Sequence, residues 1–201
     1  MTELKANTKA AMSNMSGAAE RTESAAEGAG NFDRAISELY DSSMSATDEE
    51  IIESAQKMPS DFTVIEKEIG TEADDLIEYV KYYEAAKSSY IAGSGESSAF
   101  SGKVIAEWDR QGEYTSYVMP ASDVIRTAVP KVKVTDCSLD GKTARLGIYE
   151  WMTIGYAPEE SDAVNATAYG YNFSLNIERD RKGDWKIASV DDTDQNFDWM
   201  A

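Results

Sequence analysis

Residues 131–154 read KVKVTDCSLDGKTARLGIYEWMTI, and this stretch decides the class of fold. Ahead of its turn, Val132 and Val134 alternate with polar residues, which is typical of a strand with one buried face. Asp140 followed by Gly141 favours a tight hairpin turn, because glycine readily adopts the left-handed backbone angles that such turns require. Beyond the turn, every second residue from Ala144 to Ile154 is again apolar except Glu150. The stretch therefore predicts an antiparallel hairpin.

The same period of two continues towards the C-terminus. Alternating apolar residues predict a strand over residues 169–177, and residues 185–190 predict a last strand after a glycine-containing turn. Each of these strands has an apolar face and a more polar one, as expected for a sheet packed against helices. For the strand after Gly141, one face carries Ala144, Leu146, Ile148, Met152 and Ile154, and the other carries Arg145, Tyr149, Trp151 and Thr153.

Upstream of the sheet, residues 31–92 have the period of helices. Thr47 and Glu50 form a capping box that predicts a helix start, and Pro59 predicts its end. Thr71 is expected to open a longer helix. Its apolar stripe contains Leu76, Val80 and Tyr83.

Two further segments, Val104 to Ala106 and Tyr114 to Val118, are expected to form short strands. Helices followed by an antiparallel meander predict an α+β fold, with the N-terminal helices packed on one face of a curved antiparallel sheet. The expected organisation is one α+β domain over residues 31–201, with helices at 31–92 and the sheet at 102–191. Residues 1–30 are poor in large apolar side chains, so they predict a flexible or helical tail or tether.

Composition argues against most catalytic chemistry. The chain of 201 residues contains no histidine and one cysteine, so it has no Ser-His-Asp triad, Cys-His pair or histidine metal site. Cys137 cannot form an internal disulfide, and its place at the end of a strand favours a small core residue over a nucleophile. No cofactor is expected.

Charge limits the partners. With 37 acidic and 19 basic residues, the formal net charge is −18, which disfavours nucleic acid and anionic membrane surfaces. No apolar run is long enough to cross a membrane, so membrane insertion is not expected. The charge is explained by solubility or by a partner with a basic face. We expect an unidentified protein or small ligand as partner, or a second copy of the chain docked through the sheet.

Three segments together resemble a known family: CSLDGKTARLGIYEW (137–151), AYGYNFSL (168–175) and KGDWKI (182–187). They resemble the meander of nuclear-transport-factor-2-like (cystatin-like, cone-shaped) domains. More narrowly, they are similar to the domain that precedes the amidase domain in secreted proteins of Gram-positive bacteria. The resemblance covers about residues 122–192.

The resemblance implies a cone-shaped sheet with a pocket between sheet and helices. The family's catalytic cysteine and histidine lie in the domain that follows, so no catalytic residue is carried over. With the composition, the resemblance favours a bacterial binding or assembly module, secreted or on the cell envelope, over an enzyme. The alternatives are a small dehydratase or isomerase of the same fold that uses carboxylates and tyrosines, or a cytoplasmic accessory protein if Met1 is the native start.

The candidate ligand or partner surface is aromatic and comprises Tyr149, Trp151, Tyr169 and Tyr171, with Glu150 among them. A buried Glu150 could have a raised pKa and act as a general acid or base. The alternative is a cross-strand contact with Arg145 or Arg179.

A weak calcium candidate lies near the C-terminus. Oxygen ligands stand at every second position, as at the start of a calcium loop. Phe197 occupies the position where the sharp turn needs glycine, and no bidentate glutamate follows, so a solvated acidic tail is the alternative. The candidate ligands are Asp192, Asp194, Asn196 and Asp198.

Overall fold

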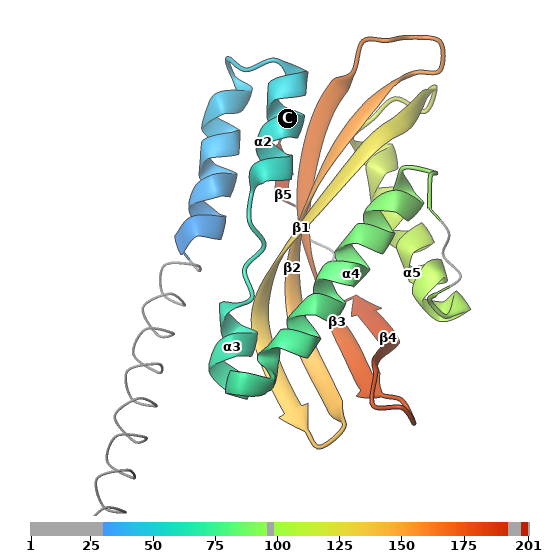
Figure 1. Ribbon diagram of the computed structural model, residues 1–201. Coiled ribbons are helices and arrows are strands. Elements are labelled where there is room, and N and C mark those ends of the chain that lie inside the picture. The colour runs from blue at the N-terminus through green and yellow to red at the C-terminus, as the bar shows by residue number, and fades with distance from the viewer. Residues whose placement is uncertain (1–29, 96–98, 193–197, 201) are drawn as a thin grey trace, which may run out of the picture.

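The computed structural model describes residues 30–95, 99–192 and 198–200. An antiparallel sheet runs in the order β1-β2-β3-β4, with a short β5 that also pairs with β3 (Figure 1). The sheet is not closed, and β1 forms one of its edges. The expected α+β class is confirmed. The strands are β1 Asp123–Asp140, β2 Thr143–Pro158, β3 Asn165–Arg179, β4 Trp185–Asp192 and β5 Asp198–Met200.

The predicted hairpin forms between β1 and β2. Asp140 pairs with Thr143, which leaves a two-residue connection, and Gly141 has a φ of 59°. A side chain at that position would be strained, which explains the glycine. The alternation along β2 is also confirmed: Ile148 and Met152 pack into one core, whereas Trp151 packs into the other.

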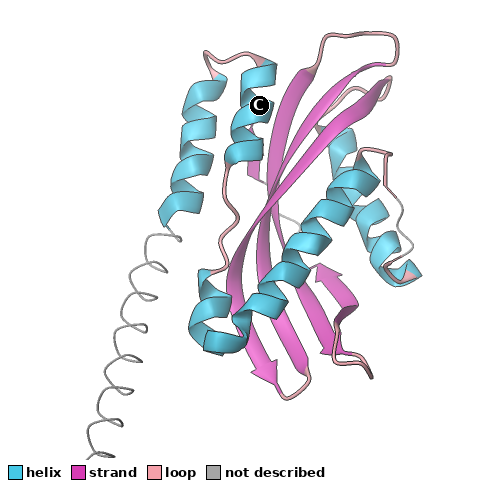
Figure 2. Ribbon diagram, viewed as in Figure 1, coloured by secondary structure: helices cyan, strands magenta, loops and turns pink. Residues whose placement is uncertain are grey.

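Helices cover both faces of the sheet, as Figure 2 shows. A helix over residues 30–43 and α2 (Asp48–Lys57) pack Phe32, Ile51 and neighbouring side chains against Trp151. The opposite face is covered by α3 (Thr63–Ile69), α4 (Ala73–Ile91) and α5 (Gly102–Gly112). The expectation that helices would cover one face is therefore wrong. Trp151 is fully buried, so its face of the sheet needed a helical cover of its own.

The expected strands over 104–106 and 114–118 are also wrong. Residues 104–106 belong to α5, and residues 114–117 belong to a 3₁₀ helix, Glu113–Tyr117, which Val118 caps. The sheet therefore begins at Asp123 and not at residue 102. In α5, Val104, Trp108 and Gln111 are buried at a spacing of four and three residues, which is the period of a helix. A short apolar run such as 104–106 fits either a strand or a buried helix, and the helix forms because of its tertiary contacts.

Local helix signals were more informative. The Thr47–Glu50 capping box is present: Thr47 N donates to Glu50 Oε2 at 2.8 Å, and Glu50 N donates to Thr47 Oγ1 at 3.3 Å. The helix ends at Lys57, one residue before the Met58 cap that precedes Pro59. The long helix begins at Ala73 instead of Thr71, because residues Gly70–Glu72 form a 3₁₀ turn first.

Candidate functional site

The apolar face of α4 contains one charged residue. Leu76, Val80 and Tyr83 are fully buried on this face, and Lys87 follows four residues after Tyr83, also with no solvent exposure. A lysine is almost never fully buried unless it is paired. The position of Lys87 in the stripe therefore demands an acceptor inside the protein.

The acceptors come from three other elements, β2, α5 and β3. Lys87 Nζ on α4 donates to Glu150 Oε1 on β2 at 2.7 Å and to Gln111 Oε1 on α5 at 2.6 Å. It also contacts the hydroxyl of Tyr171 on β3, which in turn donates to Glu150 Oε1. We call Lys87, Gln111, Glu150 and Tyr171 the buried cluster; each side chain is at most 1% exposed.

Desolvation dominates the electrostatics of the buried cluster. Burial lowers the pKa of Lys87, and the Glu150 carboxylate opposes that shift. Burial raises the pKa of Tyr171 well above its usual value, and the nearby Glu150 charge raises it further. Glu150 Oε2 is buried with no hydrogen-bond partner. The pair is therefore held by one carboxylate oxygen, and solvent does not reach it.

Aromatic rings close the space around this cluster. The ammonium of Lys87 lies 5.0 Å from the ring centre of Tyr171 and 5.1 Å from that of Phe173. Tyr83 packs against Trp108 at 5.5 Å between ring centres, and Trp108 Nε1 donates to the Tyr83 hydroxyl at 3.0 Å. Tyr83, Trp108, Tyr171 and Phe173 are all buried. The interior between the sheet and α4–α5 is filled here by side chains.

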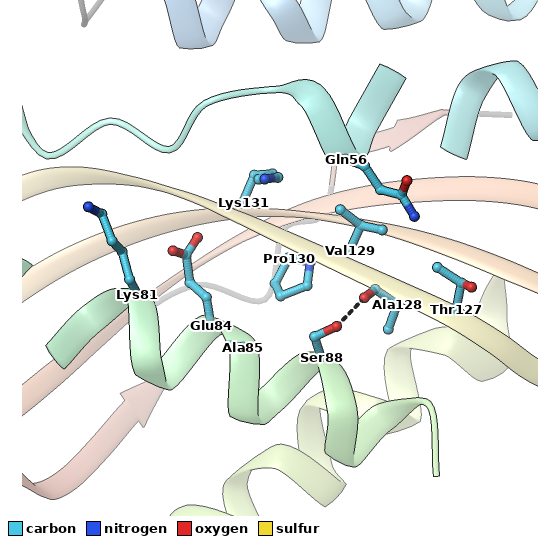
Figure 3. Close-up of a pocket in the computed structure, with 10 residues that line it drawn as sticks. All are labelled: Gln56, Lys81, Glu84, Ala85, Ser88, Thr127, Ala128, Val129, Pro130 and Lys131. Carbon is cyan, nitrogen blue, oxygen red and sulfur yellow. Dashed lines mark hydrogen bonds between the residues drawn. The ribbon is translucent and has the colours of Figure 1, made fainter. Parts of the chain in front are cut away.

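An accessible hollow lies on the outer side of α4, where the helix faces the edge strand β1. Its volume is about 380 Å³, and Figure 3 shows its lining side chains. We call it the α4–β1 pocket. It is lined by Gln56, Lys81, Glu84, Ala85, Ser88, Thr127, Ala128, Val129, Pro130 and Lys131.

Glu84 is the acidic residue of this pocket. Its Oε1 accepts from Ser60 Oγ at 2.5 Å and from the backbone N–H of Val132 at 3.2 Å, so the carboxyl satisfies an edge donor of β1. The pKa of Glu84 is raised to about 7, chiefly because burial penalises the charged form. The hydrogen bond from Ser60 opposes the rise, the Glu150 charge adds to it, and Lys131 opposes it. Glu84 therefore changes charge near neutral pH.

The backbone explains why this hollow sits where it does. Pro130 has no N–H to offer at the edge of β1, and Ser88 Oγ donates to the carbonyl of Ala128 at 2.5 Å. Further along the edge, Asp61 pairs with the strand: its N–H donates to Val132 O at 2.8 Å. Side chains and a short bridge thus form hydrogen bonds with backbone N–H and C=O groups at the edge of β1, which could otherwise pair with another strand.

The residues expected to form an aromatic surface lie on both faces of the sheet. Trp151 contacts the α2 side, whereas Tyr169, Tyr171 and Glu150 face α4 and α5. These four are at most 1% exposed, and Tyr149 is half-buried. They do not form one accessible surface. Core packing explains their aromatic character.

The expected partners of Glu150 are wrong. Arg145 donates to Ser174 Oγ at 3.3 Å, and Arg179 donates to the carbonyl of Gly183 at 2.7 Å. Glu150 instead accepts a hydrogen bond from Lys87 of α4, 63 residues away in the sequence. Sequence reasoning missed Lys87 and Glu84. The available signal for Lys87 was its charge within the apolar stripe of α4.

The remaining candidates are placed as follows. Asp192 and Asp198 belong to β4 and β5, and Asp194 and Asn196 lie outside the described residues. Within the described ranges, no three acidic or cysteine side chains are close enough together to hold a metal ion. Cys137 is a buried free thiol whose pKa is raised to about 11, chiefly by burial, as expected of a core residue. The tail and tether predicted for residues 1–30 fall almost entirely outside the described residues.

Fold and site define an α+β protein with an open antiparallel sheet, helices on both faces and a pocket at its edge strand. No family model matches the chain, and no curated protein matches it. Among solved structures it is similar to the intermembrane space region of chloroplast protein ARC6, with 14% identity and a TM-score of 0.39. That match covers 63% of this chain and 94% of the other. The likeness is too distant to bear on function.

None of the helices in the described part of the chain combines the length and the apolar character that a membrane crossing requires.

Proposed function

We propose that this chain is a non-catalytic binding or assembly module, and that the α4–β1 pocket is its ligand site. The observation that carries the proposal is the filled interior between the sheet and α4–α5. Glu150, the carboxylate at the centre of that interior, has no solvent exposure and is paired with Lys87 at 2.7 Å. A substrate would have to displace buried aromatic rings to reach it, whereas the α4–β1 pocket lies open.

We also propose a place for the module in the bacterial cell envelope or among secreted proteins. The support is the resemblance of residues 122–192 to the sheet of nuclear-transport-factor-2-like domains, in the form that precedes an amidase domain. The order of strands and the helices packed on the sheet are compatible with that relation. Fractionation of cells that express the native gene tests it, and recovery in the cytosol alone would contradict it.

One observation favours an enzyme of the same fold as the second candidate. Glu84 lines an accessible pocket and has a pKa of about 7, which suits a general acid or base at neutral pH. The non-catalytic proposal has no role for proton transfer by Glu84. The two candidates therefore differ in what they expect of a Glu84→Gln variant.

The binding proposal is tested by backbone amide spectra of the ¹⁵N-labelled protein, titrated separately with butyrate, butylamine and butanol. At least one probe is expected to shift the amides of residues 84–88, 127–129 and 131. Ala85→Trp places an indole in the pocket and should abolish the shifts. Ala106→Trp is the matched control, because Ala106 is also an exposed helical alanine but does not line the pocket. Absence of shifts with every probe would refute the proposal.

Catalysis is tested by incubating the wild type and Glu84→Gln with a metabolite mixture and following consumption by mass spectrometry. The non-catalytic proposal expects no consumption by either protein. Consumption by the wild type that the variant loses would establish the enzyme instead.

A further inference from the structure

We infer that the α4–β1 pocket binds a small monocarboxylate with a short apolar tail, held at its head group by Glu84, Lys81 and Lys131. The inference rests on the proposed function and names the ligand class of the same site.

The charged side chains of the lining lie at one end of the pocket, and the rest of the lining mixes small apolar side chains with the polar Gln56, Ser88 and Thr127. Lys81 from α4 and Lys131 from β1 lie with Glu84 at one end, as Figure 3 shows. Ala85, Ala128, Val129 and Pro130 contribute apolar surface along the hollow. The ammonium of Lys131 suits an anionic head, together with that of Lys81, which is also paired with Glu78. The small apolar side chains suit a short hydrocarbon tail.

Glu84 can add a hydrogen-bond donor for an anionic head group to the lysine charges. Its Oε1 already accepts two hydrogen bonds, from Ser60 and from the backbone of Val132, so the orientation of the carboxyl is fixed. When the carboxyl is neutral, its proton sits on the other oxygen, Oε2, and that O–H can donate to a ligand carboxylate. Such a charge-assisted hydrogen bond is short and strong. When Glu84 is ionised, the same oxygen repels the ligand.

The charged groups around Glu84 determine the balance between its neutral and ionised forms. Lys81 lies on the same helix as Glu84, and its Nζ is 2.8 Å from Glu78 Oε1. The positive charge of Lys131, on β1, favours the ionised form of Glu84. From the sheet behind, the ionised Glu150 disfavours a second negative charge at Glu84. The other facing groups carry no charge of their own: Gln56 of α2, and Ser60, which donates to Glu84. Below neutrality the charged end is therefore cationic overall, in a chain whose net charge is −18.

Calorimetric titration with butyrate at pH 6 and pH 8 tests the inference, because butyrate stays ionised at both. If binding needs neutral Glu84, a pKa of about 7 makes the neutral fraction about tenfold larger at pH 6, so binding should be about tenfold tighter there. Glu84→Gln keeps a donor at this position without titrating. Its butyrate affinity should change less than twofold between the two pH values. Affinity of the wild type that is equal at both pH values, or tighter at pH 8, would overturn the inference.

Further titrations define the chemical class. Butyramide, which has the same shape without the charge, should bind at least tenfold more weakly than butyrate. Lys131→Gln should weaken butyrate binding severalfold, whereas Lys142→Gln, at an exposed turn position outside the pocket, should not. Inorganic phosphate that binds as tightly as butyrate would indicate a general anion site and overturn the carboxylate assignment.

The failure of this inference is distinguishable from failure of the proposed function. If butylamine or butanol shifts the pocket amides and butyrate does not, the pocket remains a ligand site and the carboxylate class is wrong. If no probe shifts them, both are wrong.

Discussion

Removing one partner of the Lys87–Glu150 ion pair is expected to destabilise the protein strongly. Both side chains have no solvent exposure, and the Nζ–Oε1 distance is 2.7 Å. In Lys87→Met, Glu150 keeps only the hydrogen bond from Tyr171 and loses the compensating charge. Leaving an uncompensated buried charge costs about 3–5 kcal/mol, a large share of a typical free energy of unfolding.

The double variant Lys87→Met/Glu150→Leu separates charge burial from packing. Because both charges are removed, the desolvation cost disappears, and a well-packed apolar pair is often neutral or stabilising. We expect the loss of unfolding free energy in the double variant to be smaller, by at least about 2 kcal/mol, than the sum of the losses in the two single variants. An interaction energy of this size is within the range found for neighbouring residues. Equilibrium unfolding in urea, followed by fluorescence of the buried Trp108 and Trp151, measures each free energy.

Lys57→Met is the matched control. Lys57 forms an ion pair with Glu53 at 3.3 Å on α2, but the two side chains are 77% and 66% exposed. The free energy of unfolding is expected to fall by less than about 0.5 kcal/mol, because solvent screens exposed ion pairs on helices. A loss below about 1 kcal/mol for Lys87→Met, or strictly additive single changes in the double variant, would refute the reasoning about the buried cluster.

Three other changes probe the fold and the site. Glu84 has a folded pKa of about 7 against 4.5 for the free side chain. Its contribution to the free energy of unfolding is therefore fully present below pH 4.5 and is lost as the pH rises to 7, about 3 kcal/mol in all. Urea denaturation at a series of pH values should show a weaker pH dependence of this free energy in Glu84→Gln, and an unchanged dependence would contradict the prediction. Thr47→Ala removes the cap of α2 and should cost about 1 kcal/mol of unfolding free energy, with no effect on butyrate binding. Cys137, with a pKa of about 11, should resist iodoacetamide at pH 8 until urea unfolds the chain, and rapid labelling of the native protein would show that the thiol is not buried.

Much of the sheet was predictable because its signals are local. The alternation of Val132 and Val134, the turn at Gly141 and the two faces of β2 depend on neighbouring residues, and the structure has them as expected. The capping box at Thr47 is equally local, since its two hydrogen bonds join residues three apart. Periodicity also separated the helical half from the sheet, apart from residues 102–117, where short apolar runs fit either structure.

The candidate site was not predictable in the same way. Lys87 and Glu150 are 63 residues apart, and Glu84 meets the backbone of Val132 across 48 residues. No local pattern specifies which acceptor a buried lysine will find, or that a carboxyl on a helix will meet an edge strand.

By itself, the sequence determined the hairpin at Gly141, the strands that follow it with their faces, and the exclusion of histidine chemistry, because these depend on composition and on short-range geometry. Tertiary structure alone decided that helices cover both faces, that the interior is filled and that the accessible pocket lies at the edge of β1. The physical reason is that burial and charge pairing are properties of elements brought together from distant parts of the chain. The raised pKa of Glu84 and the pairing of Lys87 exist only once that packing is complete.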